Sequence, residues 1–342
     1  MFLGIEIGGT KLQLGVGAGD GSSLVAHERV AVEPEAGAKG IRQQIEQIGR
    51  PLIQRYEIAA VGVGFGGPVD ASSGRTITSH QVAGWDDFPL TDWCRRLFGL
   101  PAALGNDSDL AGLAEARFGA GRGRRVVFYT NAGSGIGGAL VIDGRLYHGG
   151  GGVASEIGHL RPGLQSDHPD QTIESIASGW GIAAAAQARL TEPSSVPLGP
   201  LTDGARPALP EAVRQRLIER EEADEADAAE LLEQCEGQVD RLTAAMVGRA
   251  AGEGNQLARG VFQHACQVYG WAIAQMITLL APEVVVIGGG VSLVGEEFWL
   301  APLRQQVARY VFPPLKGTVR LVPAELGEEV VLHGALAIAT AS

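Results

Sequence analysis

In the sequence L-G-I-E-I-G-G-T-K, residues 3–11, an apolar strand-like run ends in a glycine loop and a second apolar run follows. A similar stretch, T-N-A-G-S-G-I-G-G, occupies residues 130–138. Such loops let backbone N–H groups approach a polyphosphate, since no Cβ blocks the approach and a positive φ is cheap. Asn106 and Asp107 lie between the two loops in the sequence. Two phosphate loops that bracket a carboxylate indicate phosphoryl transfer.

The pattern around the first loop is repeated around the second. Residues 2–7, 12–17 and 24–32 predict three consecutive strands, which a helix near 41–52 and a strand at 59–65 follow. Residues 126–129, 139–142 and 145–147 again predict three strands. We therefore expect an internal duplication, with one domain built around each copy. Ser108 is expected to cap the helix that follows Asp107.

Composition narrows the class of protein. The chain has 342 residues, enough for two domains, and a formal net charge of -12, which disfavours nucleic acid and anionic membranes as partners. Its three cysteines are far apart and offer neither a disulfide framework nor a paired metal motif. Because the start carries no signal-peptide pattern and no apolar run reaches roughly 18 residues, we expect a cytoplasmic protein.

The second half of the chain predicts helices around one more buried strand. The charged segment 211–236 is expected to be an exposed helical pair or insertion, with a solvated acidic face and no assigned role. A long helix near 257–276 leads into an apolar strand at 284–287, which ends in Gly288, Gly289 and Gly290. A glycine-rich strand end suits a ligand at the carboxyl edge of a sheet.

Several side chains carry candidate chemistry, and each also has an ordinary structural interpretation. Lys11 and Thr10 can bind phosphate, although a Gly-Gly turn is often a simple hairpin. Asp107 can act as general base towards a sugar hydroxyl, or it is a carboxylate that stabilises a helix N-terminus. Glu156, His159 and Glu174 offer paired acceptors and donors for vicinal hydroxyls, or they form loop salt bridges. The Walker A pattern is absent, which disfavours a P-loop NTPase.

Taken in order, these motifs resemble the ROK family of bacterial sugar kinases and repressors, within the actin-like ATPase superfamily. The resemblance rests on residues 3–11, 64–70, 105–107, 131–140, 158–159, 172–175 and 282–291. It implies an α/β fold of the ribonuclease H-like type, with duplicated βββαβαβα cores in two lobes and the active site in the cleft between them. The expected lobes are residues 1–118 and 119–327, with a helical insertion near 190–256 and a final helix near 328–342 that packs back on the first lobe.

The resemblance also implies a role for each motif residue. The sugar would be bound by Gly67, Gln81, Asn106, Glu156, His159 and Glu174, and Asp107 would be the catalytic base. The nucleotide would be bound by Gly8, Gly9, Thr10, Lys11, Gly133, Ser134, Gly135, Gly137, Gly288, Gly289 and Gly290. Glu6 would face Mg²⁺ through a water molecule.

Three positions depart from the family pattern. Glu6 stands where the family usually has Asp, and Gln81 stands where an Asn often contacts the sugar. Many members hold a structural zinc with three cysteines after the Gly-His pair, whereas no cysteine lies between His159 and Glu174. We expect no structural zinc, because zinc strongly prefers thiolate and imidazole and the alternative ligands Asp167, His168 and Asp170 are typical of a solvated turn.

The expected function is therefore an ATP-dependent hexose kinase, glucokinase-like, that phosphorylates the 6-hydroxyl with Mg²⁺ and ATP. Alternatives are a kinase for an N-acetylated hexosamine, fructose or another polyol, use of polyphosphate as donor, and a non-catalytic sugar-binding regulator. Because the first predicted strand begins at Phe2, we expect no DNA-binding segment like that of the family's repressors. The resemblance also implies a homodimer.

Overall fold

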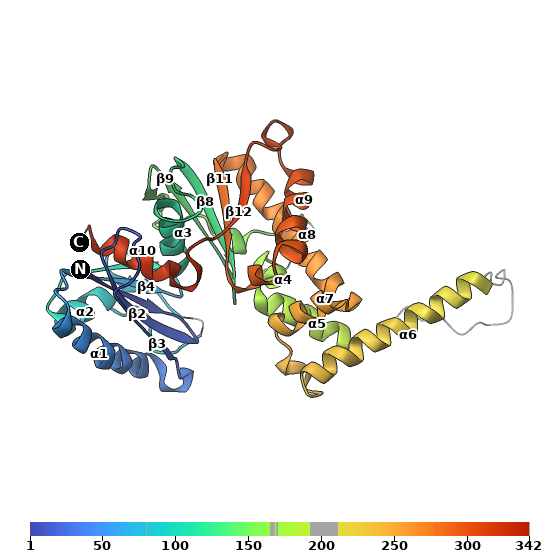
Figure 1. Ribbon diagram of the computed structural model, residues 1–342, viewed down its shortest axis with the longest axis horizontal. Helices are drawn as coiled ribbons and strands as arrows, with labels where there is room; N and C mark the ends of the chain where they lie inside the picture. Colours follow the sequence, from blue (N-terminus) through green and yellow to red (C-terminus); the bar gives the residue numbers. More distant parts are fainter. Residues whose placement is uncertain (80, 165–167, 169, 192–210, 342) are drawn as a thin grey trace.

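Two five-stranded sheets form the framework of the chain (Figure 1). The computed structural model describes residues 1–79, 81–164, 168, 170–191 and 211–341, with the backbone alone for 211–222. The first sheet has the order β3-β2-β1-β4-β7. Its strands are β1 (Phe2–Ile7), β2 (Lys11–Gly17), β3 (Ala26–Ala31), β4 (Ala60–Phe65) and β7 (Ala102–Asn106).

The second sheet repeats this topology, with the order β10-β9-β8-β11-β12. In each sheet the central strand pairs antiparallel with the strand that follows it and parallel with a later one, so β1 pairs with β2 and β4 as β8 pairs with β9 and β11. The strands are β8 (Val126–Ala132), β9 (Ile136–Ile142), β10 (Arg145–Leu146), β11 (Val284–Gly288) and β12 (Arg320–Pro323). The predicted duplication of a βββαβαβα core is confirmed.

The helices complete each core. Every residue of β4 and of β11 is buried, as expected for parallel strands covered on both faces. The helices next to the first sheet are α1 (Gly37–Arg55), α2 (Leu90–Phe98) and α10 (Val330–Ala339). The second half contains α4 (Glu174–Ala177), α5 (Gly179–Thr191), α6 (Glu211–Gln234), α7 (Ala244–Glu253), α8 (Gln256–Leu280) and α9 (Ala301–Tyr310). No helix in the described part of the chain is long and apolar enough to cross a membrane.

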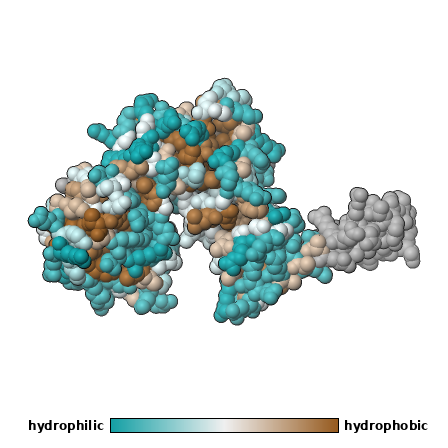
Figure 2. Space-filling view, in the orientation of Figure 1, coloured by the Kyte–Doolittle hydropathy of each residue, from teal (hydrophilic) through white to brown (hydrophobic). Residues whose placement is uncertain are grey.

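Two helices lie between the sheets. Helix α3 (Asp107–Arg117) packs on β8, β9 and α10, while α10, from the end of the chain, packs on β1 and β4. The predicted boundary at residue 118 falls directly after α3, and we propose that it separates the two lobes. Figure 2 shows the cleft that opens between the two lobes in this view.

Local structure differs from the expectations at three places. Asn106, not Ser108, caps α3, because its Oδ1 accepts hydrogen bonds from the backbone N–H groups of Ser108 (2.9 Å) and Asp109 (3.2 Å). Strand β8 continues to Ala132 and β9 begins at Ile136, so the second glycine loop is only three residues long. The charged segment forms one helix, α6, which projects from the second lobe (Figure 1).

Close contact between α10 and β4 depends on glycine. A Cβ at Gly62 would overlap the carbonyl group of Ala335, which belongs to the backbone of α10 and cannot turn away. We expect Gly62→Ala to lower the free energy of unfolding by about 2–3 kcal/mol, as overpacking in a filled core does. Gly252→Ala in α7 is the matched control, since nothing lies within 4 Å of its added methyl group. Chemical denaturation of both variants tests this, and equal stability would contradict the packing described.

Candidate active site

The parallel strands of the first sheet bring the candidate residues to one edge. Ile7 is the register partner of Phe65, and Phe65 is the partner of Asn106, so β1, β4 and β7 end side by side. Glu6 lies near the end of β1, Gly66 and Gly67 follow β4, and Asp107 follows β7. Residues separated by 100 positions in the sequence therefore share one sheet edge.

The first glycine loop is a tight turn between β1 and β2. The backbone N–H of Gly8 donates to the carbonyl of Lys11 at 3.0 Å, which closes the turn. The Lys11 Nζ lies 3.2 Å from Glu6 Oε1, so the lysine charge balances a carboxylate that is only 6% exposed. The side chain of Gln81 lies directly against Gly9, where a Cβ would overlap its amide. The loop is thus flanked by the side chains of Glu6 and Lys11, and Gln81 packs on it at Gly9.

Asp107 lies at the strand edge near the first glycine loop. Its Oδ2 is 3.4 Å from the position that a Cβ would take on Gly66, which also lies next to the Cα of Gly8. Its Oδ1 accepts a hydrogen bond from the N–H of Ser108 at 2.7 Å. Burial raises the pKa of the Asp107 carboxyl to about 6; the Ser108 N–H opposes this rise, and the charge of Glu6 adds to it. A carboxylate with such a pKa is a competent proton acceptor near neutral pH.

The second loop contacts the start of α3. Ser108 Oγ is 3.1 Å from Asn131 Oδ1, and a Cβ at Gly137 would overlap the Ser108 side chain. The loop is tightened by a hydrogen bond from the N–H of Gly133 to the carbonyl of Gly135 at 2.8 Å. Ser134 is the remaining residue of this short turn. Both glycine loops therefore adjoin the N-terminus of one helix, where the helix dipole favours negative charge.

Glu174 supports this second loop. Its Oε2 accepts a hydrogen bond from the N–H of Ile136 at 2.7 Å and lies against Gly135. Just beyond α4, the N–H of Gly179 donates to the carbonyl of Gly133 at 2.8 Å. The carboxylate predicted to bind sugar hydroxyls thus fixes the geometry of the second glycine loop.

The third glycine segment follows β11 beside β8. Gly288 is the register partner of Asn131, so the end of β11 meets the second loop. Gly289 has a φ of 88°, and a Cβ there would overlap the backbone of Ala132. Gly290 faces open space, with nothing within 4 Å of a Cβ position. A flat group of a ligand can approach the backbone at this place.

Two carboxylate–imidazole pairs lie near the candidate residues, and only the first consists of predicted ones. His159 Nδ1 lies 3.6 Å from Glu156 Oε2; the His159 side chain is exposed and that of Glu156 is half-exposed. Burial raises the pKa of Glu156, His159 opposes the rise, and the charge of Glu174 adds to it. The second pair was not predicted: Asp109 Oδ2 lies 3.7 Å from His148 Nδ1. Burial, with the charges of Glu156 and Asp107, raises the pKa of Asp109 to about 7.

Asn106, one of the predicted sugar-binding residues, is bonded to the backbone that follows β4. Besides capping α3, its Nδ2 donates to the carbonyl of Gly67 at 3.0 Å. One N–H of the amide is then left for a ligand, since the Oδ1 is already used by the helix cap. Thr10, at the tip of the first loop, is exposed.

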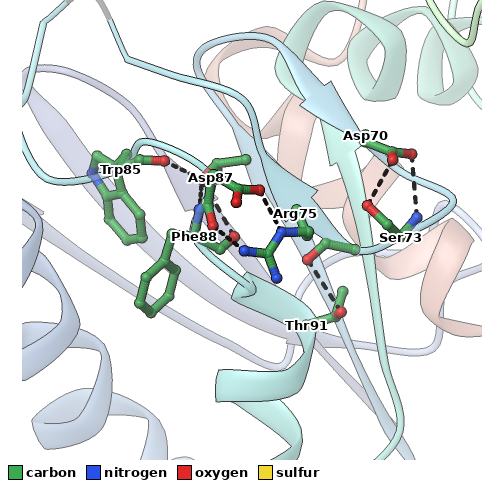
Figure 3. A network of polar contacts seen from close by, with 9 residues as sticks. Asp70, Ser73, Arg75, Trp85, Asp87, Phe88 and Thr91 are labelled. Atoms are coloured by element: carbon green, nitrogen blue, oxygen red, sulfur yellow. Dashed lines mark hydrogen bonds and ion pairs between the residues drawn. The ribbon is translucent and has the colours of Figure 1, made fainter.

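The loop that carries Gly67 and Gln81 is held by a polar network (Figure 3). Arg75 Nε donates to Asp87 Oδ1 at 2.5 Å, and the Thr76 hydroxyl donates to the carbonyl of Trp85. Thr91 Oγ1 donates to the carbonyl of Gly74 at 3.2 Å. The two short strands β5 (Val69–Asp70) and β6 (Arg75–Thr76) begin this loop.

The alternative zinc ligands considered from the sequence were Asp167, His168 and Asp170. His168 pairs with Asp170 at 3.5 Å on the surface, and Asp167 lies outside the described residues.

Glu115 is a buried carboxylate that the sequence did not single out. Its Oε1 accepts hydrogen bonds from the N–H groups of Glu325 (2.9 Å) and Leu326 (2.8 Å), and its Oε2 accepts one from Ala120 (2.8 Å). These donors lie in the two segments that run between the sheets, 118–125 and 324–329. The side chain is completely buried, and burial raises its pKa while the three N–H groups oppose the rise.

Comparison with known proteins agrees with this geometry. The model of the ROK family matches residues 2–342. This chain belongs to the ROK family. It is 28% identical over 337 residues to a glucokinase of Thermotoga maritima, covering 98% of this chain and 96% of that protein. It is also 28% identical over 347 residues to a glucokinase of Streptomyces coelicolor, covering 99% and 97%.

Among solved structures, the chain resembles a ROK family glucokinase from Streptomyces griseus in complex with glucose and AMPPNP. The TM-score is 0.77 at 28% identity, with 100% of this chain and 99% of that chain covered. The ROK fold, a two-lobed actin-like ATPase fold, is therefore shown for this chain. As a member of this family, the protein is an ATP-dependent sugar kinase.

Proposed function

We propose that this ROK kinase transfers the γ-phosphoryl group of ATP to the 6-hydroxyl of a hexose, with glucose as the first candidate. The proposal rests on the position of Asp107 at the N-terminus of α3, near the first glycine loop, while its neighbour Ser108 contacts the second loop. A phosphoryl group held by the loops and a hydroxyl held near Asp107 would meet at one point. The glucokinase relatives, one of them solved with glucose and AMPPNP, support hexose as the acceptor.

In the proposed reaction Asp107 takes the proton of the sugar hydroxyl as its oxygen attacks the γ-phosphorus. The bond between the γ-phosphorus and the bridging oxygen breaks, and ADP leaves with the electron pair. Backbone N–H groups at both glycine loops and the Lys11 ammonium stabilise the negative charge that is spread over the phosphoryl oxygens. Glu156, His159, Glu174 and Asn106 orient the sugar, and closure of the lobes excludes water from the reaction.

The residues around Glu6 fit a magnesium ion. Two carboxylates, Glu6 and Asp107, lie close enough for their charges to interact, and a cation would relieve this repulsion. Glu6 would hold Mg²⁺ through water, because each of its oxygens keeps a lone pair beyond the contacts with Lys11 and Gln13. The described residues contain no group of three or more metal ligands, so phosphates and waters would complete the shell. Bound Mg²⁺ supplies neutralisation of the β- and γ-phosphate charge.

A coupled ADP-release assay tests the proposal. The native chain, ATP and MgCl₂ are incubated with glucose, mannose, fructose, N-acetylglucosamine and N-acetylmannosamine in turn. We expect the highest kcat/KM with glucose or mannose. A clear preference for an N-acetylated sugar or for fructose would replace the acceptor but keep the kinase, and a flat response with all five sugars would support a non-catalytic sugar-binding regulator.

Gln81 is proposed to tune the choice of sugar, because it carries an amide one methylene longer than the family's usual Asn. Its side chain reaches Gly9 at the first loop. We expect Gln81→Asn to change the ratio of kcat/KM values between glucose and mannose by about 10-fold, as one methylene in a pocket does. Steady-state kinetics with both sugars measure this. An unchanged ratio would remove Gln81 from the sugar site.

A homodimer stays a prediction from the resemblance.

A further inference from the structure

The buried amide of Gln13 is the most informative polar group outside the residues discussed above. Gln13 lies on β2, is completely buried, and is the register partner of Glu6 on β1. Its Nε2 donates to Glu6 Oε2 at 2.8 Å and to the carbonyl of Glu328 at 3.2 Å. Burying an amide costs free energy unless every polar atom has a hydrogen-bond partner, so each polar atom of this side chain should have one.

The contacts of Gln13 define its orientation without ambiguity. Glu6 Oε2 and the carbonyl of Glu328 can only accept, so the NH₂ group must face both of them. The Oε1 of Gln13 then faces His27 Nε2 at 2.8 Å, and this ring nitrogen must carry a hydrogen to donate. All three hydrogen-bonding groups of the amide are therefore satisfied by three different elements.

His27 is itself held from the start of α10. Its Nδ1 lies 3.4 Å from Glu329 Oε1, and the other oxygen of Glu329 lies 3.8 Å from Nε2 of His333 in α10. Arg29, two residues along β3, pairs with Glu328. A continuous chain of polar contacts thus runs from α10 through His27 and Gln13 to the carboxylate at the first glycine loop.

We propose that Gln13, fixed by His27, is a positioning residue that holds the Glu6 carboxylate in the orientation needed for magnesium–nucleotide binding. Glu6 has two side-chain contacts: the Lys11 ammonium pairs with Oε1 at 3.2 Å, and the neutral amide of Gln13 donates to Oε2 at 2.8 Å. Without the amide, the carboxylate would be held by the lysine alone and would turn towards it. The inference rests on the proposed function only in assigning Glu6 to the metal shell.

The test measures ADP affinity by calorimetry, with and without MgCl₂, in the native chain and in Gln13→Met. Methionine keeps the volume of the side chain and removes its three hydrogen bonds. We expect the gain in ADP affinity on adding MgCl₂ to fall about 10-fold or more, as for other residues that orient a metal-binding group, while affinity without Mg²⁺ changes little. In kinetics, kcat should fall and the KM for sugar should stay within about 2-fold.

Gln44→Met is the matched control. Gln44 Nε2 also bonds a backbone carbonyl of the first lobe, that of Ala31 on β3 at 3.0 Å, but is remote from Glu6 in its contacts. It should leave the magnesium-dependent gain unchanged. His27 is partly exposed, and His27→Phe should lower the magnesium-dependent gain in ADP affinity less than Gln13→Met does. His27→Gln retains an N–H donor and should recover part of the gain that His27→Phe loses.

The outcomes separate this inference from the proposed function. If Gln13→Met and His27→Phe lose thermal stability but keep the native magnesium-dependent gain, Gln13 is structural and the inference is wrong. Should Gln13→Met fail to fold, the two His27 variants decide. If the native chain shows magnesium-dependent ADP binding but phosphorylates no hexose, the proposed function fails while the calorimetric comparison still tests Gln13.

Discussion

Asp107→Asn is expected to lower kcat by about 10³-fold, with KM values for ATP and sugar within about 3-fold of those of the native chain. Asparagine keeps the size and the hydrogen bond from the N–H of Ser108, but it cannot take the proton of the hydroxyl. General-base catalysis contributes about 10²–10⁴-fold, and this variant removes that contribution alone. Steady-state kinetics with the preferred hexose measure the loss.

Asp109→Asn is the informative comparison, because Asp109 also has a raised pKa and lies near Asp107 and Glu156. Since Asp109 does not adjoin the glycine loops through any contact described above, its replacement should reduce kcat by less than about 10-fold. The opposite ranking of the two variants would move the role of base from Asp107 to Asp109.

The pH profile gives a second measure of the same residue. Asp107 accepts a proton only when it is ionised, and its pKa is raised to about 6. The kcat of the native chain should therefore be constant above this pH and fall about 10-fold per unit below it. The residual activity of Asp107→Asn should lack this acidic limb. A native profile that is flat between pH 5 and 7 would be inconsistent with this assignment.

Glu115→Ala is expected to lower the free energy of unfolding by about 3 kcal/mol or more. The variant leaves three buried backbone N–H groups, those of Ala120, Glu325 and Leu326, without their acceptor. Each such loss costs about 1–3 kcal/mol, and bonds to a charged acceptor lie at the upper end. Denaturant unfolding followed by circular dichroism measures the change.

Glu115→Gln separates hydrogen bonding from charge. Its single amide oxygen can serve either the pair of donors at Glu325 and Leu326 or the donor at Ala120, but not both sets, so an intermediate loss is expected. Because both inter-sheet segments are bonded to this one side chain, the Ala variant should also lose cooperativity between the lobes. A single unchanged transition with native stability would show that Glu115 does not hold the segments together.

The sequence predicted the parts of the site that local patterns encode. The glycine loops, the strand end at Asp107 and the repeated strand order follow from residues that are neighbours in the chain, and parallel register then aligns β1, β4 and β7. The cap of α3 is Asn106 and not the predicted Ser108. Both Asn106 and Ser108 are good capping residues, and the choice depends on β7 continuing to Asn106.

Other features depend on partners that are distant in the sequence. Glu115 is separated from Leu326 by 211 residues, and Gln13 from Glu328 by 315. In the sequence Gln13 alternates with Leu12 and Leu14, which indicates a solvent-facing position, but both faces of β2 are covered in the fold. Asp109 is placed beside His148 only when α3 packs against the second sheet. No local pattern carries these contacts.

We propose that the chain joins the γ-phosphoryl group of ATP to the 6-hydroxyl of a hexose. Phosphorus NMR of a mixture of the native chain, ATP, MgCl₂ and glucose tests it most directly, because the resonance of the product reports which oxygen carries the phosphate. We predict one sugar phosphate, substituted at oxygen 6, formed together with an equal amount of ADP. Inorganic phosphate alone, or a sugar phosphate substituted at another oxygen, would contradict the account.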